Sequence, residues 1–171
     1  MSINPDLFRQ VLSRFATGVT IVTTRHGETV HGLTANSFCS VSLAPPLVLV
    51  CVDKNAQSHD LIQQSGNFAV NFLTLAQEEW SRRFADNQLS ADERFAGIAL
   101  HPEKTGAPVL DEALGWLDCK LFAAYAGGDH TIFVGEVVAL GQSRDQQPLL
   151  YYQSQYHQLR RDNAQTNPRL S

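Results

Sequence analysis

Short apolar, β-branched runs separated by turn residues recur along this 171-residue chain and constrain its fold more than any other feature. The first two runs, 19–25 and 30–38, flank the turn sequence His26-Gly27-Glu28 and predict a hairpin. Residues 47–53 form a continuous apolar run after Pro45-Pro46, which is typical of a strand buried on both faces. Further strands are expected at 67–73, 116–126, 131–140 and 148–152. About seven short, mostly antiparallel strands predict one mainly β domain, a closed or nearly closed barrel with flanking helices.

An amphipathic helix is expected at the start of the chain. Asn4 followed by Pro5 is a favourable helix start, and Gly18 would end the run. Between them, apolar residues recur with helical spacing at Phe8, Val11, Leu12 and Phe15. One face of this helix should therefore be apolar.

Two further helices and two polar segments complete the expected organisation. Ser58 is a natural N-cap for a short helix, and residues 76–85 have the pattern of another helix. The polar segment 86–108 is expected to be a long surface loop, and loops of this length usually serve a function. Residues 160–171 are polar and are expected to form a mobile tail, which leaves 1–159 as the folded domain.

Composition and charge argue against several kinds of partner. With 43% hydrophobic and 18% charged residues the chain resembles soluble globular proteins, and its net charge of -4 disfavours broad nucleic-acid binding. The chain does not start with a basic-then-apolar signal, and its longest apolar stretch, 47–52, is too short to span a membrane. A cytoplasmic protein is therefore expected. Cys39, Cys51 and Cys119 form no CxxC pair and are expected as buried, reduced thiols.

Two stretches concentrate small polar residues beside expected strands. Residues 32–42 carry hydroxyl and amide side chains that could form a polar strand edge or could contact a flat heterocycle. Residues 51–60 run from a strand end into the expected helix at Ser58. The amides of a helix's first turn, with that hydroxyl and Lys54, could hold a phosphate, although an ordinary capped helix explains the same pattern.

A single histidine, His130, follows the turn sequence Gly127-Gly128-Asp129 at the start of an expected strand. Its local sequence fits a structural turn residue as well as a ligand contact. No HExxH motif or tight histidine and carboxylate cluster predicts a metal site, and no GxSxG motif predicts a serine hydrolase. If the chain is an enzyme, a bound organic cofactor is therefore expected to carry the reaction.

The order and spacing of several segments resemble the short-chain flavin reductases. These FMN-binding split-barrel proteins act as the reductase components of two-component flavin-dependent monooxygenases. The resemblance covers roughly residues 5–157 and rests most strongly on TANSF with the following SVSLAPP, and on GDHTIFVGEV. The segments NFAVNFL, RRFA, ERFAG and PLLYY occur in the matching order. The resemblance implies a Greek-key, antiparallel split β-barrel.

The resemblance also implies which residues contact a flavin, either FMN or FAD. It places the TANS segment at the ring and ribityl chain, the strand end at Cys51 beside the ring, and Ser58 at the phosphate. Arg83 and Phe84 match a phosphate-side and a ring-side contact. The full set of implied flavin residues is Thr34, Ala35, Asn36, Ser37, Ser40, Cys51, Val52, Asp53, Lys54, Ser58, His59, Arg83 and Phe84.

The same resemblance places His130, Tyr151 and Tyr152 against the nicotinamide dinucleotide. It implies a homodimer that transfers a hydride from NADH, or NADPH, to flavin, which then passes in its reduced form to a partner monooxygenase. No basic cluster awaits the 2′-phosphate of NADPH, which favours NADH. Two alternatives stay open: a flavin-binding electron carrier without enzyme activity, and a reductase of the same superfamily that acts on a corrinoid, ferric or haem-type acceptor.

Overall fold

The computed structural model describes residues 3–143 and 146–160. Within these ranges the main sheet has seven antiparallel strands in the order β3-β2-β6-β9-β10-β5-β4. In chain order they are β2 (Thr20–His26), β3 (Thr29–Ala35), β4 (Cys39–Leu43), β5 (Pro46–Asp53), β6 (Asn67–Phe72), β9 (Gly115–Gly127) and β10 (His130–Gln142). The edges of this sheet are therefore β3 and β4.

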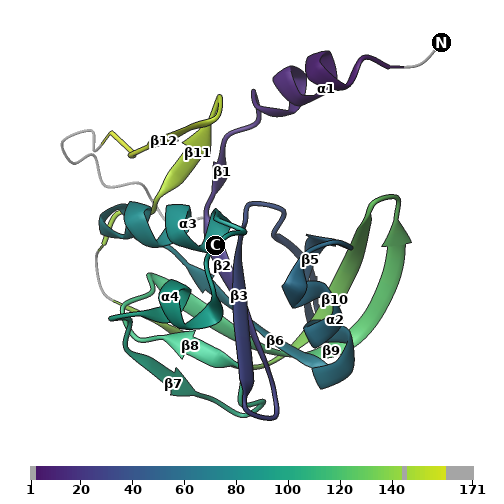
Figure 1. Ribbon diagram of the computed structural model, residues 1–171, viewed down its shortest axis with the longest axis vertical. Helices are drawn as coiled ribbons and strands as arrows, with labels where there is room; N and C mark the ends of the chain where they lie inside the picture. Colours follow the sequence, from purple (N-terminus) through teal and green to yellow (C-terminus); the bar gives the residue numbers. More distant parts are fainter. Residues whose placement is uncertain (1–2, 144–145, 161–171) are drawn as a thin grey trace.

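The two longest strands, β9 and β10, bend the sheet around its core (Figure 1). Register shifts at Val134/Gly135 and Val137/Ala139 interrupt their pairing, and such bulges increase twist and curvature. A β-carbon at Gly135 would lie 2.5 Å from the Phe68 ring, so the close approach of these elements requires glycine. The core inside the curve includes Val50, Val52, Phe68, Val70 and Phe133.

The connection between the two edge strands closes the barrel on one side. The Ser37 hydroxyl donates to the Cys51 carbonyl at 2.9 Å and accepts from the Cys51 amide at 3.1 Å. These bonds tie the segment after β3 to β5 without a continuous strand ladder between them. The expected mainly β, antiparallel split barrel with a single domain is confirmed.

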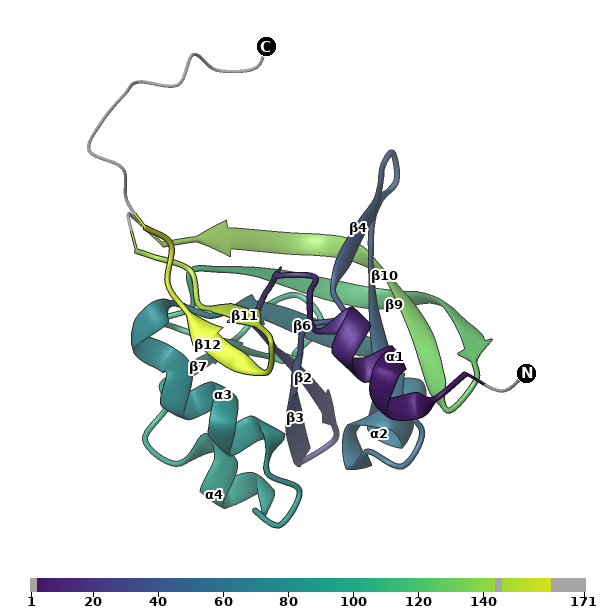
Figure 2. The same ribbon diagram turned by 90° about the horizontal axis from the view of Figure 1, so that it is seen from above.

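Small sheets and helices surround the barrel. One sheet combines β1 (Thr17–Gly18), β11 (Leu150–Tyr152) and β12 (Gln155–His157), and β7 (Leu100–Pro102) pairs with β8 (Pro108–Leu110). The helical elements are α1 (Pro5–Leu12), α2 (Gln57–Ser65), η1 (Leu75–Gln77), α3 (Glu78–Ala85) and α4 (Ala91–Phe95). In both views, α3 and α4 lie on one side of β3 and α2 on the other (Figures 1 and 2). Among the described residues, no helix is long and apolar enough to cross a membrane.

The first helix, α1, forms as the sequence predicts but buries none of its residues. The Asn4 side chain accepts from the amides of Asp6 and Leu7 and so caps the helix. The helix ends at Leu12, well before Gly18, and it stands away from the barrel (Figure 1). Its apolar residues and the ones that flank it are 52 to 77% exposed: Ile3, Leu7, Phe8, Val11, Leu12 and Phe15.

Several local predictions are wrong in detail. Residues 47–53 alternate between buried and half-exposed, so this strand is buried on one face rather than on both. The segment 86–108 is not one irregular loop, because it contains α4 and β7. Residue Ala56 occupies the N-cap of α2, so Ser58 lies inside the first turn. Apart from residue 160, the tail expected at 160–171 lies outside the described residues.

The cysteines also differ from the expectation of three buried thiols. All three are free, but Cys39 is exposed on the edge strand β4, Cys51 is half-buried, and only Cys119 is buried. Burial, with a smaller contribution from the Asp118 carboxylate, raises the pKa of Cys119 to about 12. Burial also raises the pKa of Cys51, so neither thiol is activated as a nucleophile.

Candidate functional site

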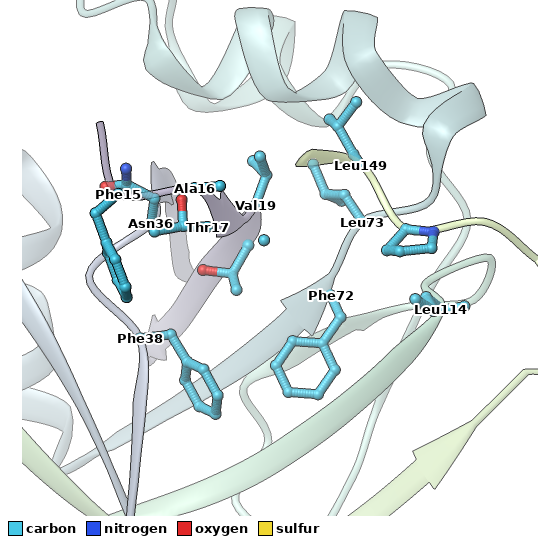
Figure 3. Close-up of a pocket in the computed structure, with 13 residues that line it drawn as sticks. Phe15, Ala16, Thr17, Val19, Asn36, Phe38, Phe72, Leu73, Leu114 and Leu149 are labelled. Carbon is cyan, nitrogen blue, oxygen red and sulfur yellow. The ribbon is translucent and has the colours of Figure 1, made fainter. Parts of the chain in front are cut away.

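A cleft opens where the β1–β11–β12 sheet meets the end of β3. Its larger cavity, about 420 Å³, is lined by residues 15–20 together with Asn36, Phe38, Phe72, Leu73, Leu114, Pro148 and Leu149 (Figure 3). A smaller cavity of about 190 Å³ shares Val19 and Asn36 with it, so the two adjoin. The smaller cavity is completed by Thr34, Ser81, Ala85, Tyr151 and Tyr156.

The walls of the larger cavity suit a flat heterocycle. The rings of Phe38 and Phe72 pack edge to face with centroids 5.1 Å apart. Asn36 is exposed, and its side chain makes no hydrogen bond within the described part of the chain. The buried Thr17 hydroxyl oxygen also has no partner among these residues. An apolar space with a few unused polar groups is the usual composition of a cofactor pocket.

The residues next to Asn36 hold the wall of this cleft in place, and their polar groups are already hydrogen-bonded within the chain. The Thr34 hydroxyl donates to the Ser81 carbonyl at 2.6 Å, which ties β3 to α3. Ala35 points into the core and is 8% exposed, and Ser37 is engaged with Cys51. The TANS segment therefore positions Asn36 as its free polar side chain.

A third cavity, about 230 Å³, lies at the start of α2. Ala56 gives this helix no side-chain cap, so the amides of Gln57 and Ser58 in its first turn are available to a ligand. Arg94 reaches the cavity from α4 although it is only 2% exposed. The lining residues include no acidic side chain among those described: His31, Leu33, Asn55, Ala56, Gln57, Ser58, Asn87 and Arg94. A buried cation beside a helix N-terminus suits an anion.

Strand β3 borders both the cleft and this anion cavity. His31 and Leu33 line the anion cavity, whereas Thr34 and Asn36 line the cleft. At about 3.3 Å per strand residue, His31 and Thr34 are roughly 10 Å apart along β3. This length is comparable to an extended five-carbon polyol with its phosphate. The residues present therefore fit a flavin whose ring occupies the cleft and whose phosphate lies at the start of α2.

His130 lies at the tip of the β9–β10 hairpin, opposite Asp53 of β5. Its side chain is 41% exposed, and Nδ1 lies 2.8 Å from the Asp129 carboxylate. The hydrogen bond from His130 and then its charge lower the pKa of Asp129. Lys54 braces the same turn, because its Nζ donates to the Gly128 carbonyl at 2.6 Å. The ring of His130 is thus held beside the strand end and remains accessible.

The two tyrosines expected to share a ligand with His130 lie elsewhere in the chain. Tyr151 lines the smaller cavity of the cleft, and Tyr152 packs against His157 with ring centroids 5.9 Å apart. The β11–β12 pair and the tip of the β9–β10 hairpin lie on opposite sides of the molecule (Figure 1). Within one chain, His130 and these tyrosines are therefore not brought together.

Several other expected flavin residues have structural roles. Phe84 is 1% exposed and packs edge to face on Phe95, so its ring has no face free for a flavin. Val52 is fully buried in the core and can offer only its backbone. Arg83 donates to the Ala96 carbonyl at 2.7 Å and pairs with Glu79.

Three more members of the expected set are engaged within the chain or lie away from the cavities. The ring nitrogens of His59 lie 2.8 Å from the Asp60 carboxylate and 2.8 Å from the Thr131 hydroxyl. The Asp53 carboxylate accepts from the Asn55 amide at 2.8 Å and shapes the turn before α2. Ser40 is exposed on β4 and lines neither the cleft nor the anion cavity.

The sequence reasoning missed His31 and Arg94. His31 precedes the TANS segment on β3, and Arg94 belongs to ERFAG, whose segment was expected to be a loop. The only signal for either residue was its proximity to these motifs. Their contact joins positions 63 residues apart, which local patterns do not predict.

Taken together, the split barrel, its apolar cleft and the anion cavity along the same strand define a protein suited to hold a flavin-like nucleotide. A family model described as flavin reductase like domain matches residues 12–160. The chain belongs to this family, and it is an oxidoreductase.

Named relatives and solved structures agree with this assignment. The chain is 38% identical over 156 residues to the flavin-dependent monooxygenase reductase subunit HsaB of Mycobacterium tuberculosis, covering 90% of this chain and 82% of that protein. It is 45% identical over 132 residues to an NADH-dependent FAD reductase of Streptomyces globisporus, covering 76% and 72%. The structure of flavin reductase PheA2 superposes with a TM-score of 0.85 at 40% identity, covering 93% and 100%. The NADH:FAD oxidoreductase SgcE6 of Streptomyces globisporus, in complex with NAD and FAD fragments, gives 0.87 at 36% identity, covering 96% and 99%.

Proposed function

We propose that this flavin reductase transfers a hydride from NADH to FAD or FMN and releases the reduced flavin to a partner monooxygenase. The observation that carries the proposal is that β3 borders both the apolar cleft and, a few residues earlier, a separate cavity suited to an anion. The relative HsaB is a monooxygenase reductase subunit, and the structure of SgcE6 contains NAD and FAD fragments, which supports the same reaction here. A flavin, when bound, supplies the hydride acceptor, so the protein contributes mainly alignment.

Each part of the site has a separate task in this proposal. Asn36 orients the polar edge of the ring, and the Phe38 and Phe72 side chains exclude water from the cleft. Ser58 and the first turn of α2 hold the phosphate. His130, whose ring remains exposed at the hairpin tip, contacts a part of the NADH dinucleotide other than the hydride-donating ring, because this tip and the β11–β12 wall of the cleft lie on opposite sides of the molecule (Figure 1). Hydride transfer itself needs no protein acid or base.

Steady-state oxidation of NADH in the presence of FAD or FMN tests the proposal. We expect turnover with either flavin, and a higher kcat/KM with NADH than with NADPH. Asn36→Ala should raise the KM for flavin about fivefold, because one neutral hydrogen bond is lost. Gln63→Ala, which removes an exposed amide on α2, is the matched control. Flavin binding without NADH oxidation would indicate a carrier, and turnover only with a ferric, haem or corrinoid acceptor would indicate the other reductase class.

We also infer that the protein works as a homodimer. The apolar residues of α1 have no partner within the described chain, and Phe122 and Tyr125 of β9 are more than half exposed. A half-exposed large apolar side chain offers roughly 100 Å² for burial. The α1 residues and this part of β9 therefore offer somewhat less than 1,000 Å² per subunit, which is on the order of a standard interface. A second copy of the chain is the partner that would cover both surfaces.

The monooxygenase need not dock on this protein, because reduced flavin can reach it by diffusion. We place both proteins in the cytoplasm, where the three free cysteines of this chain would stay reduced. An assay with the two proteins separated by a membrane permeable only to small molecules tests this arrangement. Product formation is expected when O2 is admitted to the oxygenase compartment after anaerobic transfer of the reduced flavin across the membrane.

A further inference from the structure

Three buried side chains form a continuous hydrogen-bonded chain beside the anion cavity. Arg94 Nη1 lies 3.1 Å from His31 Nε2, and His31 Nδ1 lies 2.5 Å from the Ser58 hydroxyl. The exposed fractions of these residues are 2% for Arg94, 5% for His31 and 0% for Ser58. Arg94 is fixed by further bonds to the Gly32 carbonyl at 2.9 Å and the Asp86 carbonyl at 2.8 Å.

The direction of each hydrogen bond in this chain follows from the chemistry of arginine. A guanidinium has only donors, so His31 Nε2 must accept and the proton of the neutral ring must be on Nδ1. Burial, and next the charge of Arg94, lower the pKa of His31, which agrees with a neutral ring. His31 Nδ1–H then donates to the Ser58 oxygen. Because that oxygen is accepting, the Ser58 proton points to a different acceptor, and none is found among the described residues.

We propose that Arg94 and His31 are positioning residues that fix Ser58 as a hydrogen-bond donor to the flavin phosphate. The proposal rests on the proposed function and adds the residues that set the phosphate end of the site. The unused Nε of Arg94, buried among the cavity residues without a partner in the described chain, independently indicates a missing acceptor. The uncapped amides of Gln57 and Ser58 point to the same kind of ligand.

The cluster also has a structural role, because Arg94 joins α4 to the edge of β3. A structural role alone predicts that His31 variants affect stability and affect all ligands equally. We call the arrangement in which Arg94 and His31 act through Ser58 the relay. It predicts a loss of flavin affinity that depends on the phosphate. It also predicts that the donor at the Nδ1 position matters and that the loss appears only while Ser58 is present.

Titration of the full chain with FMN and with riboflavin, followed by flavin fluorescence, separates these possibilities because riboflavin lacks the phosphate. His31→Gln loses the donor to Ser58, whereas His31→Asn keeps an amide N–H near the Nδ1 position. We expect His31→Gln and Ser58→Ala to weaken FMN binding about tenfold, as for a hydrogen bond to a charged group. His31→Asn should stay within about threefold of the wild type. Riboflavin affinity should not change in any of these variants.

A double variant tests whether His31 acts through Ser58. His31→Gln combined with Ser58→Ala should bind FMN no more than about twofold more weakly than Ser58→Ala alone. The relay would be overturned if the two substitutions weaken FMN binding by factors that multiply in the double variant, or if FMN and riboflavin lose affinity equally. If His31→Gln does not fold, His31→Leu fills the same space without a polar atom and carries the same expectation. A wild-type protein that binds neither flavin would overturn the proposed function itself, whereas normal turnover of NADH with unaltered FMN affinity in the variants would overturn the relay alone.

Discussion

His31 makes the stability of the folded chain depend on pH. Burial and then Arg94 lower the pKa of His31, with a smaller opposing contribution from Gln57, and Ser58 completes the set of groups that face the ring. Below about pH 6.5 the unfolded chain therefore binds a proton that the folded chain does not, and stability falls as the pH falls. We expect the thermal midpoint to drop between about pH 7 and about pH 5 by more in the wild type than in His31→Leu. Parallel curves for the two proteins would contradict this assignment.

His130 is expected to affect one substrate only. Its ring is exposed at the hairpin tip and does not line the phosphate cavity, so its removal should not disturb flavin binding. We expect His130→Ala to raise the KM for NADH about tenfold, with FAD affinity unchanged. His26→Ala, at the exposed end of β2, is the control. An unchanged KM together with lost flavin binding would reverse the assignment.

Gly135 should not tolerate even a methyl group. A β-carbon there would lie 2.5 Å from the Phe68 ring and 2.8 Å from the Cys119 β-carbon, both in the buried core. Gly135→Ala should therefore cost about 1 to 3 kcal/mol of unfolding free energy, measured by urea denaturation. Gly18→Ala is the comparison, because no atom lies within 4 Å of the added carbon. Equal stabilities for the two variants would show that the core relaxes around the new methyl.

Some site residues were predicted from the sequence, but the structure gives them a different local role from the one expected. Asn36 was expected from its motif, and it is the free amide of the cleft. Ser58 was expected as a helix cap, yet it lies in the first turn and its oxygen meets His31. The contact between His31 and Arg94 depends on how α4 folds against an edge strand. The residues next to His31 and Arg94 in the sequence do not indicate this contact.

At the scale of elements, α4 depends on its capping box. It has only five residues, too few to be stable alone, and the Ser90 hydroxyl accepts from the Glu93 amide while Glu93 accepts from Ser90. These bonds lower the pKa of Glu93. Ser90→Ala should cost about 1 kcal/mol and should weaken binding of FMN but not of riboflavin, because α4 carries Arg94. Gln88→Ala, just before the helix, should change neither the stability nor the FMN affinity. If Ser90→Ala weakens riboflavin binding as much as FMN binding, α4 does not act on the phosphate end of the site.

Which elements were predicted depends mainly on their length. The β2–β3 hairpin was expected because both strands have seven residues and a clear turn. The three-residue strands β7, β8 and β12 were not expected, since so few residues show no period. The opening helix was expected from its apolar face, but nothing in the sequence indicated that this face would lack a partner in its own chain.

At the scale of the whole molecule, the apolar face of α1 is the best test of the dimer. Leu7 and Val11 are one turn apart and are 58% and 61% exposed. We expect light scattering after size exclusion to give a dimer for the wild type and a monomer for Leu7→Asp with Val11→Asp. Gln10→Glu adds a charge to the same helix and should leave the dimer intact. A monomeric wild type, or a doubly substituted dimer, would contradict the inference.

The hydrogen bonds along β3 have a consequence for the behaviour of the protein in solution. As an edge of the main sheet, β3 has backbone groups that another polypeptide could pair with, and such edges promote aggregation. Arg94 occupies the Gly32 carbonyl, and Thr34 ties the strand to α3, so part of this edge is already covered. Arg94 and Thr34 thus also protect this edge from pairing with another chain. Loss of α4 would leave the chain both poor at retaining its cofactor and prone to self-association through β3.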